Sequence, residues 1–518
     1  MAAEVLPVLV IGGGPVGLAL AEELAFHNIP VTVVEPRTVV DHSRPRAKTT
    51  SVRTMEHFRR WGVADALRVA APLDRAFSRR VTFVQNVTGR EVTHIDGCLG
   101  LDTGLDVSPE PAQQVTQPIV EEVLRRHLAV HAGVELLFGW RATVVEQVGE
   151  QVHVSLADEE GAIREVRADW VVGADGPRSL VRHAMGASYE GSAGGRPNVN
   201  ITFRSTQLQR LIPHAPSIHY WVLDPLAPGV VGPLDQDGTW WAISTGTESI
   251  DDVAHAKRIV RALVGHEIDV DVIATDPWQA RMLLADKYRE GRLFIVGDAA
   301  HQNPPWGGHG FNTGVGDAVN LGWKLAAVIS GWARETLLDS YGAERRPIER
   351  QTIALAASNM AVVSSHLADP ALMETGVAFE QARSRLGPKI HEAKSPEFFS
   401  AGLVLGYGYG PTSSEQAPSP AEYRPILAAG NRLPHRFVDG SPIYDLLGPW
   451  FTVIGPRSDA DALIREAARR NIPLLHVDQP GPDVLLVRPD QHIAWIGSPP
   501  FDAEAILDDA LTGFDTVG

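Results

Sequence analysis

The first 35 residues of the chain combine two short apolar runs with one amphipathic segment between them. Residues 8–11 form a continuous apolar run followed by glycines, which is typical of a buried parallel strand. The next segment, PVGLALAEELAFHN, places Val16, Leu20 and Leu24 on one helical face, with Glu22 and Glu23 on the opposite, polar face. A second apolar run, VTVVE, follows. The pattern predicts a strand–helix–strand unit at the N-terminus.

The apolar pattern changes again further along the chain. Residues 195–280 contain strand-like runs such as NVNITFRS, IHYWVLD and GTWWAIST, which predict an antiparallel sheet inserted into the first domain. The segment GRLFIVGD restores the buried-strand pattern, and helical patterns continue to about residue 400. A stretch rich in Gly, Pro and Ser, GYGYGPTSSEQAPSPAEYRP, then predicts a linker before a small α/β unit.

These changes predict an α/β protein with five parts. We expect the first part of a Rossmann-like dinucleotide-binding domain over residues 1–185 and the inserted substrate-binding sheet domain over 186–280. The first domain returns, followed by helices, over residues 281–405. A linker at 406–430 precedes a C-terminal α/β domain at 431–518.

Charge and composition exclude several classes of function. The chain has 518 residues and a formal net charge of -17, so neither nucleic acid nor an anionic membrane is expected as a partner. Cys98 is the only cysteine, which excludes an intrachain disulfide and Cys-based metal clusters, and we expect no metal. No apolar run reaches membrane-spanning length, and the N-terminus lacks the basic start of a signal peptide, so we expect a cytoplasmic protein.

The first glycine-rich turn carries the spacing of a dinucleotide site. Gly12, Gly14 and Gly17 match GxGxxG between the predicted strand and helix. The first glycine permits a tight turn, the second admits a pyrophosphate, and the third lets the helix approach the strand. Glu35 ends the second strand, at about the offset expected for a carboxylate that binds ribose hydroxyls. This segment does not distinguish NAD from FAD.

A second glycine-rich stretch, VGDAAHQNPPWGGHGFNTG, favours a flavin. Asp298 follows a buried strand directly, where its carboxylate can reach a ligand that lies across the strand ends. Pro304 and Pro305 fix the backbone and remove two N–H donors, and the glycines after them expose backbone to a flat ligand. The dipole of the following helix favours negative charge. Because a reduced isoalloxazine ring is anionic, this arrangement suits a flavin better than a nicotinamide.

Three motifs in order, GGGPVG, GADGPRSLVR and GDAAHQNPPWGGHGFNTG, resemble the signatures of the FAD-dependent aromatic (phenol-type) hydroxylases, the group A single-component flavoprotein monooxygenases. The resemblance covers about residues 5–350. It implies a p-hydroxybenzoate hydroxylase-like fold, with a Rossmann-like FAD-binding domain and an inserted antiparallel-sheet substrate domain. The segments GNRLPH and LLVRPDQHIAW resemble the small thioredoxin-like C-terminal domain of the phenol hydroxylase branch, here without redox cysteines.

The resemblance also implies an activity. NADPH or NADH would reduce FAD, and dioxygen would then hydroxylate a phenolic or polycyclic aromatic substrate through a flavin hydroperoxide. Two alternatives stay open: Baeyer–Villiger-type oxygenation on the same fold, and a flavin-binding protein without turnover. The expected partners are a small aromatic substrate and dioxygen, and the chain could form a homodimer.

Site residues follow from the resemblance by position. Glu35 is expected at the adenosine ribose and Asp298 at the ribityl hydroxyls. Arg46 and Gln117 occupy positions that contact FAD in the family, and the alternatives are a surface arginine and a helix cap. Trp306, with the two prolines before it, is expected to keep water from the flavin. The expected cofactor-binding set is Gly12, Gly14, Gly17, Glu35, Arg46, Gln117, Asp175, Asp298, Gly310, Phe311 and Asn312.

A base beside the substrate hydroxyl would speed the reaction, because an electrophilic oxygen attacks a phenolate faster than a phenol. His309 is the preferred catalytic candidate because it lies beside the expected flavin position. His219, Tyr220 and Asp235 are the further substrate-site candidates, although His219 and Tyr220 could be plain sheet residues. Residues 195–280 lack a cluster of cations, so a neutral or weakly acidic phenol fits better than a small dicarboxylate.

Overall fold

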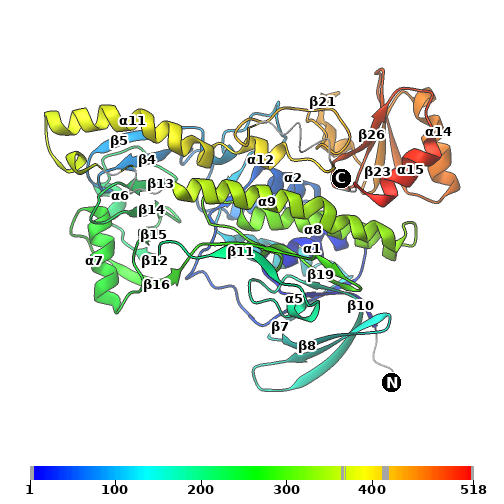
Figure 1. Ribbon diagram of the computed structural model, residues 1–518, viewed down its shortest axis with the longest axis horizontal. Helices are drawn as coiled ribbons and strands as arrows, with labels where there is room; N and C mark the ends of the chain where they lie inside the picture. Colours follow the sequence, from blue (N-terminus) through cyan, green and yellow to red (C-terminus); the bar gives the residue numbers. More distant parts are fainter. Residues whose placement is uncertain (1–4, 363–366, 368, 411–418, 515–518) are drawn as a thin grey trace.

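The structure is a computed structural model that describes residues 5–362, 367, 369–410 and 419–514. Three regions follow one another along its longest axis: a sheet domain under α11, a central domain crossed by α8 and α9, and a C-terminal domain with α14 and α15 (Figure 1). Residues 411–418 of the predicted linker lie outside the described residues. Within the described part of the chain, no helix is long and apolar enough to cross a membrane.

The central domain is built on a mostly parallel sheet with the strand order β18-β19-β10-β1-β2-β7. β1 pairs in parallel with β2 and β10, β2 with β7, and β10 with β19, so the expected N-terminal strand–helix–strand unit is present. β8 and β9 extend the sheet from the start of β10. The strands are β1 (Val5–Ile11), β2 (Val31–Glu35), β7 (Val134–Phe138), β8 (Arg141–Val148), β9 (Gln151–Ala157), β10 (Ile163–Gly173), β18 (Arg289–Glu290) and β19 (Leu293–Ile295).

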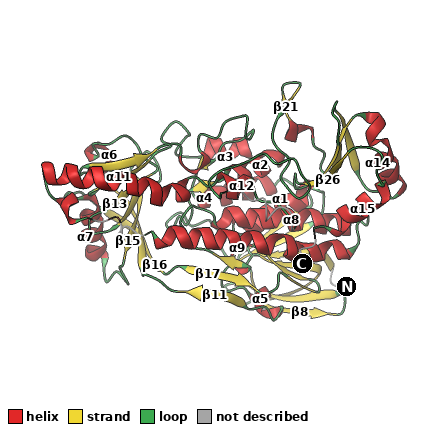
Figure 2. Cartoon of the chain, turned by 45° about the horizontal axis from the view of Figure 1, so that its top comes forward, coloured by secondary structure: helices red, strands yellow, loops and turns green. Residues whose placement is uncertain are grey.

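Helices from several parts of the chain cover the central sheet. α1 packs against both α4 and α8, and α9 lies beside α8 (Figures 1 and 2). The helices are α1 (Pro15–Phe26), α2 (Val52–Arg60), α3 (Ala64–Ala70), α4 (Gln117–Leu128), α5 (Leu180–Ala184), α8 (Gly310–Ile329) and α9 (Ser340–Ala361).

The structure corrects one expectation about α1. Glu22 and Glu23 were expected on a polar face, but both side chains are buried. Glu22 accepts hydrogen bonds from the ring of His127 on α4, and Glu23 accepts one from Arg60 at 2.7 Å. The helix is enclosed because α4 and α8 pack against it and Arg60 and Trp61 reach Glu23, and paired cations compensate the two buried carboxylates.

The substrate-side domain is a seven-stranded sheet in the order β16-β12-β15-β14-β13-β4-β5. The expected strands at 198–204, 219–222 and 239–245 are present. β4 and β5 come from the segment 1–185 that sequence assigned to the dinucleotide domain, and β4 pairs in parallel with β13. The strands are β4 (Val81–Val84), β5 (Glu91–Ile95), β12 (Asn198–Arg204), β13 (His219–Val222), β14 (Gly229–Pro233), β15 (Thr239–Thr245) and β16 (Asp271–Trp278).

Each face of this sheet has its own helical cover. α6 (Leu208–Leu211) and α7 (Val253–Val264) pack on one face, and α11 (Val377–Phe398) with α12 (Ala401–Leu405) covers the other. A three-stranded sheet of β11 (Tyr189–Ala193), β17 (Arg281–Ala285) and β20 (His301–Gln302) connects the two domains. β3 (Thr49–Thr50) and β6 (Gln113–Gln114) form a short antiparallel pair, and α2 begins shortly after β3.

The C-terminal domain has the thioredoxin-like topology that the sequence predicts. Its sheet order is β24-β23-β25-β26, with β23 parallel to β24 and antiparallel to β25. The elements are β23 (Phe451–Gly455), α14 (Arg457–Arg469), β24 (Leu474–Asp478), β25 (Val484–Val487), β26 (Ile493–Gly497) and α15 (Ala503–Thr512).

Buried ion pairs join the C-terminal domain to the central helices. The Arg488 guanidinium donates to both carboxylate oxygens of Glu344 on α9, each at 2.8 Å, and to Asp490 at 2.7 Å. Lys324 on α8 donates to the same Glu344 at 2.8 Å. From the other side, Arg53 on α2 donates to Gln491 Oε1 at 2.6 Å. The loop at residues 488–491 therefore anchors the C-terminal domain to the central helices.

Candidate functional site

The glycine turn between β1 and α1 leaves open space at one of the three glycines of the GxGxxG motif. A Cβ at Gly12, whose φ is +113°, would lie 2.3 Å from the carbonyl oxygen of Ala174, and one at Gly17 would lie 1.9 Å from that of Gly12. A Cβ at Gly14 would meet no atom within 4 Å. No side chain caps α1, so its first N–H groups are available to a ligand. The turn therefore has the shape and polarity of a phosphate cradle.

Glu35, at the end of β2, closes one side of this turn. Its Oε2 accepts the Gly13 N–H at 2.8 Å, and its Oε1 accepts both the backbone N–H and the Nε of Arg37, at 3.0 and 2.7 Å. Arg37 also contacts Glu121, to which the Gln117 amide donates at 2.9 Å. Two of the predicted residues, Glu35 and Gln117, thus meet in one network, which Arg37 links. No pattern in the sequence singles out Arg37, because a charged residue after a strand carries no local signal.

Asp298 lies in the short helix η2 (Gly297–Ala299), directly after β19. Its side chain is accessible, yet desolvation by the surrounding protein raises the pKa of its carboxyl group, with opposing effects from His301 and Arg46. An accessible carboxylate that is nevertheless desolvated is typical of a group that lines a recess. Tyr189 fixes the turn, because its hydroxyl donates to the carbonyl oxygen of Asp298 at 2.5 Å.

The middle motif packs beside this turn. Asp175 Oδ2 accepts the Leu180 N–H at 2.7 Å, whereas its Oδ1 is buried and has no hydrogen-bond partner among the described residues. Burial raises the pKa of the Asp175 carboxyl group. Arg182 lies 3.8 Å from the centre of the Tyr189 ring and donates to the carbonyl oxygen of Ala299 at 3.1 Å. The middle motif therefore supports the turn that carries Asp298.

Asn312 locks the third motif to the segment before α2. Its Oδ1 accepts the Ser51 N–H at 2.8 Å and the Thr54 hydroxyl at 2.9 Å. Its Nδ2 donates to the carbonyl oxygens of Thr49 and Gly308, at 3.0 and 2.8 Å. Because the protein uses this whole side chain, only the backbone of Asn312 remains for a ligand. No side chain caps α8 either.

The residues present fit FAD. An open glycine at an uncapped helix, a carboxylate at the end of β2 and a second carboxylate in a recess after β19 match the diphosphate, ribose and ribityl groups in kind. A Cβ at Gly310 would meet no atom within 4 Å, so the backbone at the start of α8 is open to a flat ring. Phe311 is part of the central hydrophobic core instead, with its side chain buried.

Aromatic rings gather on the sheet face that α11 covers. The His219 ring lies 5.8 Å from Phe398, 6.1 Å from Trp241 and 6.4 Å from Trp221. Trp306 packs against the same hydrophobic cluster, and its ring lies 5.7 Å from that of Trp278. This face is therefore the one that the third motif approaches.

The structure does not bring the other two substrate-side candidates to this face. Tyr220 follows His219 on β13, so it points to the opposite face, where it is buried in the cluster under α6 and α7. Asp235 lies in the turn between β14 and β15, where its Oδ1 accepts the backbone N–H groups of Asp237 and Thr239. Of the three predicted substrate residues, only His219 faces the third motif.

His309 is buried immediately before α8. Burial lowers the pKa of its imidazole to about 4, and its Nε2 has no hydrogen-bond partner within the described part of the chain. Gly307 lies against it, since a Cβ there would be 2.6 Å from Nε2. Pro304 is buried and Pro305 is exposed, so the stiff part of the loop runs from the interior to the surface.

A buried ionic cluster supports the third motif from beneath. His301 Nε2 lies 2.8 Å from Asp317 Oδ2, and its Nδ1 lies 3.1 Å from Glu349. Arg345 pairs with both carboxylates, at 2.9 Å each. Asp317 also accepts the Gly297 N–H at 3.1 Å, so the cluster holds the turn that carries Asp298. No sequence motif revealed it, because its members come from α8, α9 and β20.

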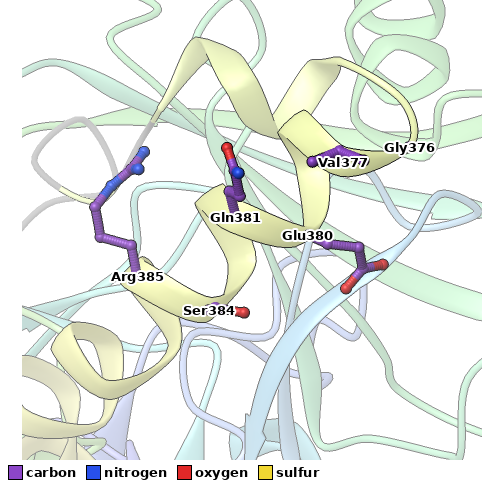
Figure 3. Close-up of a pocket in the computed structure, with 6 residues that line it drawn as sticks. All are labelled: Gly376, Val377, Glu380, Gln381, Ser384 and Arg385. Carbon is purple, nitrogen blue, oxygen red and sulfur yellow. The ribbon is translucent and has the colours of Figure 1, made fainter.

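A shallow recess on α11 has no such chemistry. Figure 3 shows that the side chains of its helical turns fan out instead of converging on one point. We assign it no function. Its lining residues are Gly376, Val377, Glu380, Gln381, Ser384 and Arg385.

Comparisons with known proteins agree with this geometry. A family model described as an FAD binding domain matches residues 5–356. The chain is 31% identical to a putative polyketide hydroxylase of Streptomyces halstedii, over 96% of this chain and 94% of that protein. It is 31% identical to a 4-methyl-5-nitrocatechol 5-monooxygenase of Burkholderia sp., over 98% and 97%. The structure of the flavin-dependent monooxygenase PieE with FAD and substrate has a TM-score of 0.89 at 26% identity, and the match covers 98% of this chain and 99% of that chain.

Proposed function

This chain belongs to the FAD-dependent aromatic hydroxylases, and we propose that its substrate is a polycyclic phenol, which it hydroxylates with NADPH or NADH as the reductant. It is an FAD-dependent monooxygenase that acts on aromatic substrates. The finer assignment, to a polycyclic phenol, rests on the shape and chemistry of the substrate side.

One observation carries this assignment: large aromatic side chains with few charges gather between α11 and the sheet face that it covers. Phe398 and Trp221 belong to the hydrophobic cluster on this face, and Trp241 and Trp306 pack against it. Broad apolar walls with a few polar groups favour a large flat aromatic ligand over a small dicarboxylate. The likeness to a putative polyketide hydroxylase supports the same class.

Each part of the site has a role in this function. FAD, when bound, supplies the transfer of electrons from NADPH or NADH to dioxygen. The turn at Gly12, Gly14 and Gly17 would bind its diphosphate, Glu35 its adenosine ribose and Asp298 its ribityl chain. Supporting positions in this assignment are Arg46, Gln117, Asp175, Gly310, Phe311 and Asn312.

The third motif would keep water from the reacting atoms. Pro304 offers no N–H, and the half-buried Trp306 ring packs against Trp278 and closes the loop. His309 would contribute a neutral imidazole to this wall, because burial lowers its pKa to about 4. Whether His309 also accepts a proton from substrate is tested together with the proposal below.

Aerobic oxidation of NADPH and of NADH by the FAD-loaded protein tests the function. The panel should contain hydroxyanthraquinones, naphthols and catechols, with free FAD at the same concentration as the control. We expect a hydroxyanthraquinone to accelerate oxidation while little peroxide is released, and NMR of the product should show a new ring hydroxyl.

Other results would contradict the proposal. Full conversion of dioxygen to peroxide would mean that the phenol triggers flavin reduction without being oxygenated. A product with oxygen inserted into a C–C bond would identify Baeyer–Villiger chemistry instead. Failure of NADPH and NADH to bleach the flavin with every phenol would favour a flavin-binding protein without turnover.

The quaternary state and location stay predictions. We expect a homodimer in solution, which light scattering of the purified holoprotein would test. We also expect a cytoplasmic enzyme, which fractionation of the producing cells would test.

A further inference from the structure

Lys48 lies where the central domain meets the substrate-side sheet. It immediately precedes β3, and its carbonyl oxygen accepts the Val115 N–H at 2.9 Å, so its backbone is fixed beside β6. Its Nζ donates to the carbonyl oxygen of Ile218, which precedes β13. Its Nζ also lies 5.9 Å from the centre of the Trp241 ring. The side chain therefore extends from the FAD domain onto the aromatic sheet face.

Lys48 differs from the other enclosed lysines in having no acidic partner. Lys324 pairs with Glu344 at 2.8 Å, and Lys394 pairs with Glu397 at 3.0 Å. Among the described residues, no carboxylate forms an ion pair with Lys48. Burial alone lowers the pKa of its amino group to about 7, although the side chain keeps some accessible surface. Lysines are rarely enclosed unless they are paired with an acidic group. The acidic partner of Lys48 is therefore expected to come from a ligand.

Three further polar atoms on the same face, the Trp221 Nε1 among them, have no partner within the described residues. The His219 Nε2 and the Trp241 Nε1 are both buried without a hydrogen bond. A Cβ at Gly232 would be 2.8 Å from Trp241 Nε1 and 2.8 Å from the carbonyl oxygen of Ile218, so these two atoms lie close to one point. Because Lys48 Nζ donates to that same carbonyl oxygen, the indole N–H and the lysine nitrogen border one region.

The titratable groups that face Lys48 do not compete for a proton at neutral pH. His219 on β13 is kept neutral, since burial together with the charges of Lys48 and Lys394 lowers its pKa to about 3. On α11, Lys394 and Glu397 already neutralise each other. A base with a pKa near 7 is well suited to take a proton from an acidic phenol at that pH.

We propose that Lys48 is a catalytic residue that binds the substrate hydroxyl and takes its proton, holding the substrate as a phenolate, with the Trp241 N–H as a second donor to the oxygen. This proposal rests on the proposed function, because it requires an acidic polycyclic phenol. In the step, the substrate O–H bond breaks and an N–H bond forms on the neutral amine. The resulting ammonium remains paired with the phenolate, and the proton returns to the product oxygen on release.

This assignment changes the role expected of His309. His309 lies beside α8, and its pKa of about 4 makes it a weaker base than Lys48. His309 then helps to keep water from the cofactor, whereas Lys48 faces the sheet on the substrate side. The two side chains come from different segments, so variants separate their effects.

The probe is alizarin, a hydroxyanthraquinone whose anion absorbs to the red of oxidised flavin. It is titrated into oxidised, FAD-loaded protein, and the pH at which bound dye ionises is compared with that of free dye. In the wild type we expect bound alizarin to be anionic at a lower pH than free alizarin. Lys48→Met should reduce the ratio of anion to neutral bound dye at pH 7 at least tenfold. Lys48→Arg, which keeps a positive charge, should retain the anion, and His309→Asn should leave the ratio unchanged.

Turnover gives a second measurement that a merely structural role would not change in the same way. Lys48→Met should lower kcat at pH 7, since its side chain neither accepts the proton nor pairs with the phenolate, whereas Lys48→Arg, which retains the anion, should keep kcat closer to that of the wild type. At a pH above the ionisation of free dye, the Lys48→Met variant should recover activity. Normal FAD content and circular dichroism identify variants that have folded.

Distinct results overturn distinct claims. If bound dye ionises alike in the wild type and in a folded Lys48→Met variant, the assignment of Lys48 is wrong while the proposed function stands. If His309→Asn abolishes the anion instead, the base is His309 and the proposal fails. If alizarin does not bind the wild type at all, the polycyclic phenol class and the Lys48 proposal are both overturned.

Discussion

Alanine at Gly14 and alanine at Gly17 should separate FAD binding from folding. At Gly17 the new Cβ would lie 1.9 Å from the carbonyl oxygen of Gly12, which belongs to the backbone of the turn and cannot rotate away. Overpacking of this kind costs about 1–3 kcal/mol. At Gly14 the Cβ would meet no protein atom within 4 Å, and the residue already has a φ of -75°, which alanine adopts freely. The apoprotein should therefore lose less than about 0.5 kcal/mol there.

The two variants should respond differently to FAD. A ligand present at 100 times its Kd stabilises a protein by about 2.7 kcal/mol, and a tenfold weaker affinity reduces this to about 1.4 kcal/mol. Because the open space at Gly14 is where we place the diphosphate, Gly14→Ala should lose at least this tenfold affinity. Its thermal unfolding midpoint without FAD should match the wild type, while the rise on adding FAD should be about half as large.

Differential scanning fluorimetry of apoprotein and FAD-loaded protein measures both quantities, and quenching of flavin fluorescence gives the Kd independently. Gly17→Ala should lower the midpoint in both states. The reasoning would be refuted if Gly14→Ala bound FAD as tightly as the wild type, because the open glycine would then not face the phosphates. A folded, fully stable Gly17→Ala apoprotein would equally contradict the close approach of α1 to the turn.

Three further variants test other parts of the structure. The folded protein raises the pKa of His301 to about 9, so the stability that its protonated form contributes is complete below about pH 6.5 and is lost as pH rises through 9. The thermal unfolding midpoint of the wild type should therefore fall between pH 6.5 and 9, and His301→Gln should flatten this fall. Gly232→Ala, which places a Cβ 2.8 Å from Trp241 Nε1, should weaken alizarin binding in an absorbance titration while FAD content stays unchanged. Arg488→Met should lower stability by about 3–5 kcal/mol, seen in urea unfolding, because Glu344 loses a buried partner.

The elements around the cofactor were predictable because their signals are local. The run at residues 8–11, the glycine turn and the amphipathic helix after it are neighbours in sequence, and the structure has β1, α1 and β2 in that order. The same holds for Asp298 after β19 and for the helix that begins at Gly310. Short connections leave a strand–helix–strand unit few alternatives.

Long-range pairing was not predictable. The apolar run at 81–84 indicates a strand, but nothing in it selects the distant β13 over the sheet of its own domain. Burial of Glu22 and Glu23 likewise depends on α4 and on Arg60, which come from separate segments. A charged residue on an amphipathic helix gives no local sign that another helix will cover it.

The substrate side shows both kinds of limit. The sequence indicated both His219 and Tyr220 as substrate-site candidates, but adjacent residues on a strand point to opposite faces, and the structure turns only His219 toward the third motif. Lys48 gave no signal, because its enclosure is produced by Ile218 and Trp241 from a different domain. Sequence therefore indicated the cofactor and the class of chemistry, whereas the group that faces the substrate emerged only from packing.

The segment at 47–51 connects the two sites mechanically. The carbonyl oxygens of Ala47 and Lys48 accept the N–H groups of Gln117 and Val115. The Thr49 carbonyl oxygen and the Ser51 N–H both bond to the side chain of Asn312 at the start of α8. The Lys48 amine therefore projects from a backbone that is rigid relative to the third motif. Catalysis gains most when the reacting groups are held before the substrate arrives. A lysine fixed in this way keeps the substrate oxygen in register with the cofactor through one short stretch of chain.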